Sequence, residues 1–185
     1  MNIVKRILLN DLTSVLVPLV VLFFVLVTTS NGFLSSYNIT SLLEQITIFA
    51  LIGLAQMLAL SLGQFNLALG SIGCLSAISM GFFMQVMGLP VAIALLLGLI
   101  IAAVLGWIQG VLIARSGINP FIITLALLSV YYGLATGITQ GKAYDKLPPT
   151  IQTINSMHFG PVPVVFLVAL IVCALVYFLF RYMSI

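Results

Sequence analysis

Six apolar stretches, each close to the length of a membrane-spanning helix, dominate this sequence. They cover residues 13–30, 42–62, 67–87, 90–114, 120–139 and 164–182. A helix needs about 20 predominantly apolar residues to cross a bilayer. Only helices and closed barrels span lipid, because backbone polar groups find no other partner there. The stretches are continuously apolar rather than alternating, so they predict helices.

Charged residues make up only 5% of the 185 residues, and 63% are hydrophobic. A soluble domain normally carries about a quarter charged residues. A chain with so little polar surface cannot cover its apolar residues in water. We therefore expect an all-α integral membrane protein, a polytopic bundle of about six transmembrane helices, with residues 1–185 forming a single transmembrane domain.

The first stretch allows two interpretations. Lys5 and Arg6 precede it, and a secretory signal peptide also has a basic start and an apolar segment. No A-x-A-like cleavage site follows, because the next residues are Thr-Thr-Ser-Asn-Gly at 28–32. This favours an uncleaved first helix.

The basic residues predict an orientation. If the N-terminus is cytoplasmic and six helices alternate, four basic residues lie inside and two lie outside. Lys and Arg near helix ends favour the cytoplasmic side, so the pattern predicts an N-in, C-in layout. The inside residues are Lys5, Arg6, Arg115 and Arg181, and the outside residues are Lys142 and Lys146.

A polar, glycine-flanked segment at 63–71 interrupts the apolar run from residue 42 to residue 87. It contains Gln64, Asn66 and Ser71 between two glycines. One reading is a tight hairpin between two spanning helices, with the polar groups at the water interface. The other is a break that lines a cavity, since irregular backbone at membrane depth must be buried in protein or face water, and transporters often bind substrate at such a break. The sequence leaves both readings open.

No pattern typical of catalysis or metal binding occurs. His158 is the one histidine, in a connector that has no Ser or Cys nucleophile pattern beside it, and Cys74 and Cys173 form no C-x-x-C pair. No G-x-x-x-x-G-K-[ST] phosphate-binding loop is present. We expect neither an enzyme nor a chain that binds metal or ATP itself, and the scattered basic residues do not indicate a nucleic-acid partner.

Neutral polar side chains at membrane depth are the candidates for a solute path. Amides and hydroxyls can bind a polyhydroxylated solute without burying a charge, although they can equally hold helices together. The candidates are Gln64, Asn66, Ser71 and Thr124. Gln109 lies beside a stripe of small residues and is interpreted as a helix-packing residue. The stripe itself, which predicts close helix packing, comprises Gly98, Ala102, Gly106, Gly110 and Ala114, and shorter stripes run through Gly73, Ala77 and Gly81 and through Gly133, Gly137 and Gly141.

Several segments, in order along the chain, resemble the membrane permeases of ribose-type ABC importers. Residues 63–71, GQFNLALGS, resemble the family's G-G-x-D-L-S-V-G-S signature, and residues 118–125, INPFIITL, are similar to its I-P-P-F-I-V-T-L segment. Residues 132–135, 139–141 and 147–148 resemble its R-G-L-A, T-G-G and L-P succession, and 33–39 and 53–56 also fit. Asn66, Gln64 and Ala68 replace the family's Asp, second Gly and Ser.

This resemblance implies a permease of the bacterial cytoplasmic (inner) membrane that passes a sugar or sugar-like solute inward. Its partners would be ABC ATPase subunits that bind the ATP, an external solute-binding protein and a second permease subunit. The outer connector, with Lys142, Asp145 and Lys146, becomes a candidate docking surface for the binding protein. In such permeases a cytoplasmic ATPase-docking segment and about four more helices follow, so residues 1–185 would be the N-terminal portion of a longer fold. The alternative is a truncated, non-transporting membrane protein with an assembly or regulatory role.

Overall fold

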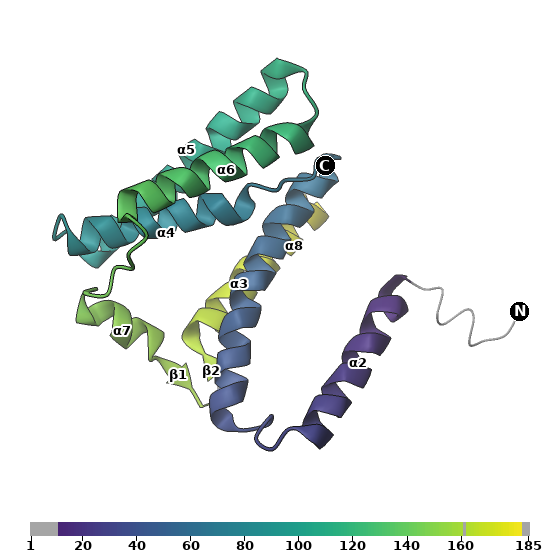
Figure 1. Cartoon of the computed structure of the whole chain (residues 1–185). Helices are drawn as coiled ribbons and strands as arrows, with labels where there is room; N and C mark the ends of the chain where they lie inside the picture. Colours follow the sequence, from purple (N-terminus) through teal and green to yellow (C-terminus); the bar gives the residue numbers. More distant parts are fainter. Residues whose placement is uncertain (1–10, 161, 183–185) are drawn as a thin grey trace, which may run out of the picture.

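The structure, a computed structural model, describes residues 11–160 and 162–182 and is almost entirely helical (Figure 1). Lys5 and Arg6 lie outside the described residues. The long helices are α2 (Asp11–Thr29), α3 (Ser36–Ser61), α4 (Leu69–Gln85), α5 (Val91–Ser116), α6 (Pro120–Thr139) and α8 (Val164–Tyr182). Between α6 and α8 lie the short helix α7 (Pro149–Asn155) and a hairpin of β1 (His158–Phe159) and β2 (Val162–Pro163).

The helices α3, α5, α6 and α8 are each long and apolar enough to cross a membrane. The 17-residue helix α4 and the apolar part of α2, Val15–Thr29, are shorter apolar helices. Most of the large apolar side chains on these helices are exposed, as expected where lipid or further protein replaces water. The predicted all-α, polytopic membrane fold is confirmed.

The second helix begins earlier than the apolar pattern predicts. The apolar stretch predicts a helix from residue 42, whereas α3 begins at Ser36. The hydroxyl of Ser35 accepts a hydrogen bond from the Asn38 N–H at 3.3 Å, and the Asn38 amide donates to the Phe33 carbonyl oxygen at 2.7 Å. Side-chain capping of this kind satisfies the free N–H groups of a first turn, so polar residues start a helix that hydropathy alone does not detect.

The helices α4, α5 and α6 pack into one group, which contains the buried core. The core residues are Ala68, Ile72, Leu75, Tyr131 and Ala135. Two hydrogen bonds fix the register of the three helices. The Ser76 hydroxyl on α4 donates to the Gly98 carbonyl oxygen on α5 at 2.7 Å, and the Tyr131 hydroxyl on α6 donates to the Leu105 carbonyl oxygen on α5 at 3.1 Å.

The small-residue stripes make close contacts at few positions, and one of them is Ala102, which packs against the core. Gly98 is buried against the Met80 side chain, and Gly81 lies against the ring of Tyr144. Other stripe glycines have open space where a Cβ would lie: Gly73, Gly106, Gly110, Gly133 and Gly137. The prediction that the stripes form the contacts among these three helices is therefore wrong at these five glycines. The buried residues of α4 include one stripe residue, Gly81, and otherwise are Ser71, Ile72, Leu75, Ser76, Ser79 and Met84.

The helices α3 and α8 form a second group, joined to the first through the segments 62–68 and 140–163 (Figure 1). The β1–β2 hairpin pairs His158 with Pro163 and Phe159 with Val162, and it lies at the start of α8. The sequence predicted only a connector at 140–163, and the structure adds α7 and this hairpin to it. The helix α2 stands apart from both groups in Figure 1.

Candidate functional site

The helix α3 ends at Ser61, and the backbone is irregular until α4 begins at Leu69. The Gly63 N–H donates to the Leu60 carbonyl oxygen at 2.8 Å, and the Gln64 N–H donates to the Ala59 carbonyl oxygen at 3.1 Å. Gly63 has a φ of 71°, in the left-handed region that glycine adopts without strain. These contacts close the end of α3 and turn the chain away from it.

The side chain of Gln56, on α3, forms hydrogen bonds to the backbone of the polar segment. The hydrogen-bonding pattern sets the orientation of its amide: the nitrogen donates to the Asn66 carbonyl oxygen at 2.8 Å, and the oxygen accepts from the Asn66 N–H at 3.3 Å. One side chain thus satisfies both backbone groups of a residue that has no helix or strand partner. The sequence analysis missed this role. The available signal was a glutamine inside an apolar helix, ten residues before Asn66.

Two of the predicted path residues converge on Ala68, which is fully buried. The Asn66 side-chain oxygen accepts from the Ala68 N–H at 2.9 Å. The Ser71 hydroxyl, 7% exposed, donates to the Ala68 carbonyl oxygen at 2.9 Å. The amide and the hydroxyl therefore shape the entry into α4. Gln64 lies half-buried in the same segment.

The structure favours the break over the tight hairpin. In Figure 1, α4 leaves the end of α3 at a large angle and joins α5 and α6 rather than folding back along α3. The polar segment is thus a corner between the two helix groups.

Thr124 of α6 lies at the same end of the bundle as this corner. The rings of Phe65, in the polar segment, and Phe121, at the start of α6, have centroids 6.5 Å apart. Thr124 is one turn beyond Phe121 and donates to its carbonyl oxygen at 3.2 Å. With 1% of its surface exposed, it is a buried polar group at the level of the break. The structure therefore brings the four predicted path residues to one end of the α4–α6 group.

Gln109 of α5 is 5% exposed, and its side-chain oxygen has no hydrogen-bond partner among the described residues. It lies about one turn beyond Leu105, toward the same end of the bundle as the polar segment. The interpretation of Gln109 as a helix-packing residue is supported by its burial, but its oxygen makes no bond to another described helix.

The predicted docking residues lie at the opposite end of α6. Lys142 and Asp145 line one cavity of about 490 Å³, and both are exposed, as is Lys146. The backbone N–H of Lys146 donates to the side-chain oxygen of Gln85 at 3.0 Å, which ties the connector to the last residue of α4. The three charged residues therefore share one anchored surface loop.

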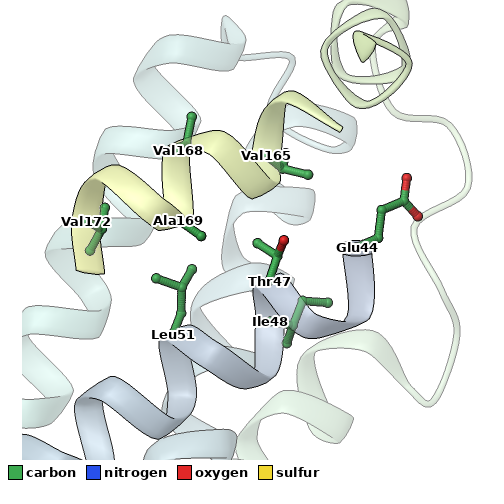
Figure 2. Close-up of a pocket in the computed structure, with 8 residues that line it drawn as sticks. All are labelled: Glu44, Thr47, Ile48, Leu51, Val165, Val168, Ala169 and Val172. Atoms are coloured by element: carbon green, nitrogen blue, oxygen red, sulfur yellow. The ribbon is translucent and has the colours of Figure 1, made fainter. Parts of the chain in front are cut away.

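A groove of about 450 Å³ is lined by residues of α3 and α8 (Figure 2). Figure 2 shows Glu44 at one end, with its carboxylate directed away from the valines of α8. Thr47 contributes the other polar side chain, and its hydroxyl donates to the Leu43 carbonyl oxygen at 2.8 Å. The remaining lining is aliphatic, so the groove lacks the hydrogen-bonding groups that a polyhydroxylated solute requires. Its lining residues are Glu44, Thr47, Ile48, Leu51, Val165, Val168, Ala169 and Val172.

The fold and the polar corner define a multi-pass helical membrane protein built around a polar interruption. The chain belongs to the family described as branched-chain amino acid transport system / permease component, which matches residues 38–185. It is thus a member of a family of transport permeases, a multi-pass protein of the bacterial inner membrane. No solved structure matches the chain.

Curated relatives carry the names of sugar permeases. The chain is 35% identical to the fructose import permease protein FrcC of Rhizobium meliloti over 118 residues, which are 62% of this chain and 33% of the relative. It is 30% identical to the D-allose transport system permease protein AlsC of Escherichia coli over 149 residues, 80% of this chain and 45% of the relative. It is 32% identical to the L-arabinose ABC transporter permease protein AraH of Azospirillum brasilense over 131 residues, 71% of this chain and 38% of the relative.

These matches confirm the resemblance to permeases of sugar-type ABC importers. The aligned part of the chain covers less than half the length of each of these relatives.

Proposed function

We propose that the chain is a transmembrane permease subunit of an ABC-type importer for a sugar or sugar-like solute, and that it forms part of the translocation path. The observation that carries this proposal is the polar corner at 62–68, which the Gln56 side chain braces inside an otherwise apolar bundle. Irregular backbone of this kind persists in a membrane where protein or a water-filled route surrounds it. The names of the sugar permease relatives supply the solute class.

In this proposal Gln64, Asn66, Ser71 and Thr124 line the cytoplasmic part of the path. The Asn66 amide and the Ser71 and Thr124 hydroxyls presently bond backbone groups of their own segments. Hydroxyl groups retain acceptor capacity while donating, so a solute hydroxyl can bind Ser71 or Thr124 once the helices separate. The path residues carry no charge, which matches a neutral solute.

The partners in this proposal are ABC ATPase subunits, an external solute-binding protein and a second permease subunit, in a homo- or heterodimer. The chain itself holds no cofactor and catalyses no reaction; the ATPase subunits bind ATP. Lys142, Asp145 and Lys146 form the docking surface for the binding protein, because exposed charges of both signs steer and orient an encounter. Residues 1–185 form one transmembrane domain that is the N-terminal portion of a longer permease fold.

Uptake in the native cells tests the proposal. Deleting the coding sequence should abolish uptake of radiolabelled D-fructose, D-allose or L-arabinose, and restoring it should recover that uptake. ATP depletion should stop the recovered uptake, and an ATPase should co-purify with the tagged chain. Uptake of all three sugars that is unaffected by the deletion, with no ATPase bound to the chain, would refute the proposal.

A further inference from the structure

A second polar cavity, separate from the polar corner, lies between α4, α6 and the connector that follows α6. Its volume is about 370 Å³, within the range of about 300–1,000 Å³ that small-molecule sites occupy. The residues that matter for its chemistry are Cys74 of α4, Tyr132, Thr136 and Thr139 of α6, and Lys142 and Tyr144 of the connector.

Three polar groups of this cavity are free to bind a ligand. The hydroxyls of Tyr132 and Tyr144 and the ammonium of Lys142 make no hydrogen bond within the part of the chain that the structure describes. Thr136 donates to the Tyr132 and Gly133 carbonyl oxygens, each at 3.0 Å. The Thr136 hydroxyl accepts no hydrogen bond from another described residue, so its lone pairs can accept one from a ligand.

The apolar part of the lining complements these groups. Ile78, Ala135 and the rings of the two tyrosines supply the apolar part of a lining that also has phenol, hydroxyl and ammonium groups. A sugar has the same division, with C–H faces between its hydroxyl edges. The lining contains no carboxylate, so it does not favour a cationic ligand. A neutral polyhydroxylated solute matches both halves of this surface.

The connector forms a fixed wall of the cavity. A Cβ placed on Gly81 would lie 2.7 Å from the Tyr144 ring, so only glycine lets this ring rest on α4. Two residues further on, the Lys146 N–H is bonded to Gln85 at 3.0 Å. The tyrosine is thereby held at the cavity before a ligand arrives, and a preorganised wall lowers the entropy that binding costs.

The buried core closes the cavity on its inner side. Ala135 lines the cavity and also belongs to the core cluster, which extends through Leu75 and Ile72 to Ala68 at the polar corner. The two polar regions are therefore separated by packed apolar side chains. With the connector placed outside by the basic residues, the cavity opens outward and the corner lies on the cytoplasmic side.

We propose that this cavity is the outer entry site of the path, where a neutral polyhydroxylated solute binds between Tyr132, Tyr144 and Thr136 before the core opens. This inference rests on the proposed function and adds a site that the sequence did not indicate. It commits to sugar binding at residues different from those of the cytoplasmic corner.

Cys74 provides a reporter inside the cavity. In a Cys173→Ser chain in native membranes, N-ethylmaleimide should modify Cys74 at a measurable rate. The transported sugar among D-fructose, D-allose and L-arabinose should slow that rate at least threefold at saturation. Cys173 of α8 lies outside the cavity, so its modification in a Cys74→Ser chain should not respond to any sugar.

A second measurement removes the two phenol hydroxyls and keeps the rings. Tyr132→Phe combined with Tyr144→Phe should raise the KM of uptake about tenfold, which corresponds to about 1.4 kcal/mol, with less than a twofold change in the maximal rate. Tyr37→Phe is the matched control, because Tyr37 is exposed at the start of α3, and it should leave the KM unchanged.

The outcomes separate this inference from the proposed function. Uptake that proceeds while Cys74 is unreactive, or while no sugar protects it and the double variant keeps its KM, would overturn the entry site and leave the function standing. Protection of Cys74 without uptake would support the site and overturn the transport function. If no sugar protects Cys74 and the cells show no uptake, both the entry site and the transport function are overturned.

Discussion

Gln56 is the residue on which the geometry of the polar corner depends. Its amide bonds both backbone groups of Asn66, and replacing it with leucine leaves an N–H and a carbonyl without partners in apolar surroundings. We expect Gln56→Leu to lower the stability of the chain by about 1 kcal/mol, measured as thermal unfolding in detergent. The control is Gln45→Leu, an exposed glutamine of the same helix, which should have no effect. Equal effects of the two variants would contradict the bracing role.

Asn66 gives a second test at this scale, because the family signature that residues 63–71 resemble has an aspartate at this position. Asn66→Asp keeps an oxygen that can accept from the Ala68 N–H, and it places negative charge before the N-terminus of α4, where the helix dipole stabilises it. We expect Asn66→Asp to match the wild type in thermal stability and Asn66→Leu to lose about 1 kcal/mol. If the aspartate variant is as unstable as the leucine variant, the cost of burying the carboxylate exceeds the stabilisation from the Ala68 N–H and from the α4 dipole.

The residue scale also shows what the sequence could and could not reveal. Asn66 and Ser71 can be recognised in the sequence, because a polar residue within an apolar run needs a hydrogen-bond partner at membrane depth. The pairing of Gln56 with Asn66 does not stand out, because it depends on the path of the chain around Gly63. The cavity of Tyr132, Tyr144 and Thr136 is hidden for the same reason, since it joins α4, α6 and a connector.

At the scale of helices, Gly98 decides how closely α4 approaches α5. A Cβ at this position would collide with the Met80 side chain, so Gly98→Ala should destabilise the chain by about 1–3 kcal/mol in thermal unfolding. Combining it with Met80→Ala should recover part of the loss, since the two positions share the same space.

Gly106→Ala serves as the matched control for this substitution, because a Cβ there has no neighbour within 4 Å. Alanine is the better helix former, so this variant should be as stable as the wild type or slightly more stable. A loss as large as that of Gly98→Ala would mean that glycine flexibility, rather than contact with Met80, accounts for both effects.

Hydropathy predicts the helices of this chain well where burial in lipid determines them. The ends of α5, α6 and α8 fall within about two residues of the predicted ranges. The start of α3 and all of α7 escape prediction, because their first turns contain polar residues or proline and depend on local capping or backbone geometry. The small-residue stripes predicted that these helices associate, but they did not predict which face of α4 is buried.

For the whole molecule, the orientation in the membrane follows from where the basic residues lie. Arg115 is in the last turn of α5 and Arg181 is in the last turn of α8. Lys142 follows the far end of α6, a helix of 20 residues, so Arg115 and Lys142 are separated by about 30 Å along the bundle. This spacing is sufficient to place them on opposite sides of a bilayer core. The sequence predicts this orientation in the membrane, whereas the arrangement of the α3–α8 group beside the α4–α6 group came from the structure.

Cysteine labelling tests this orientation, and with it the assignment of the outer cavity and the cytoplasmic corner. In a Cys74→Ser, Cys173→Ser chain in spheroplasts, Lys142→Cys should react with a membrane-impermeant maleimide, and Arg115→Cys should react only after permeabilisation. The reason is that Lys and Arg near helix ends favour the cytoplasmic side, and the N-in layout places four basic residues inside, Lys5, Arg6, Arg115 and Arg181, against Lys142 and Lys146 outside. If Arg115→Cys reacts in sealed spheroplasts while Lys142→Cys does not, the polar corner faces outward. The cavity of Tyr132 and Tyr144 would then be the exit of the path rather than its entrance.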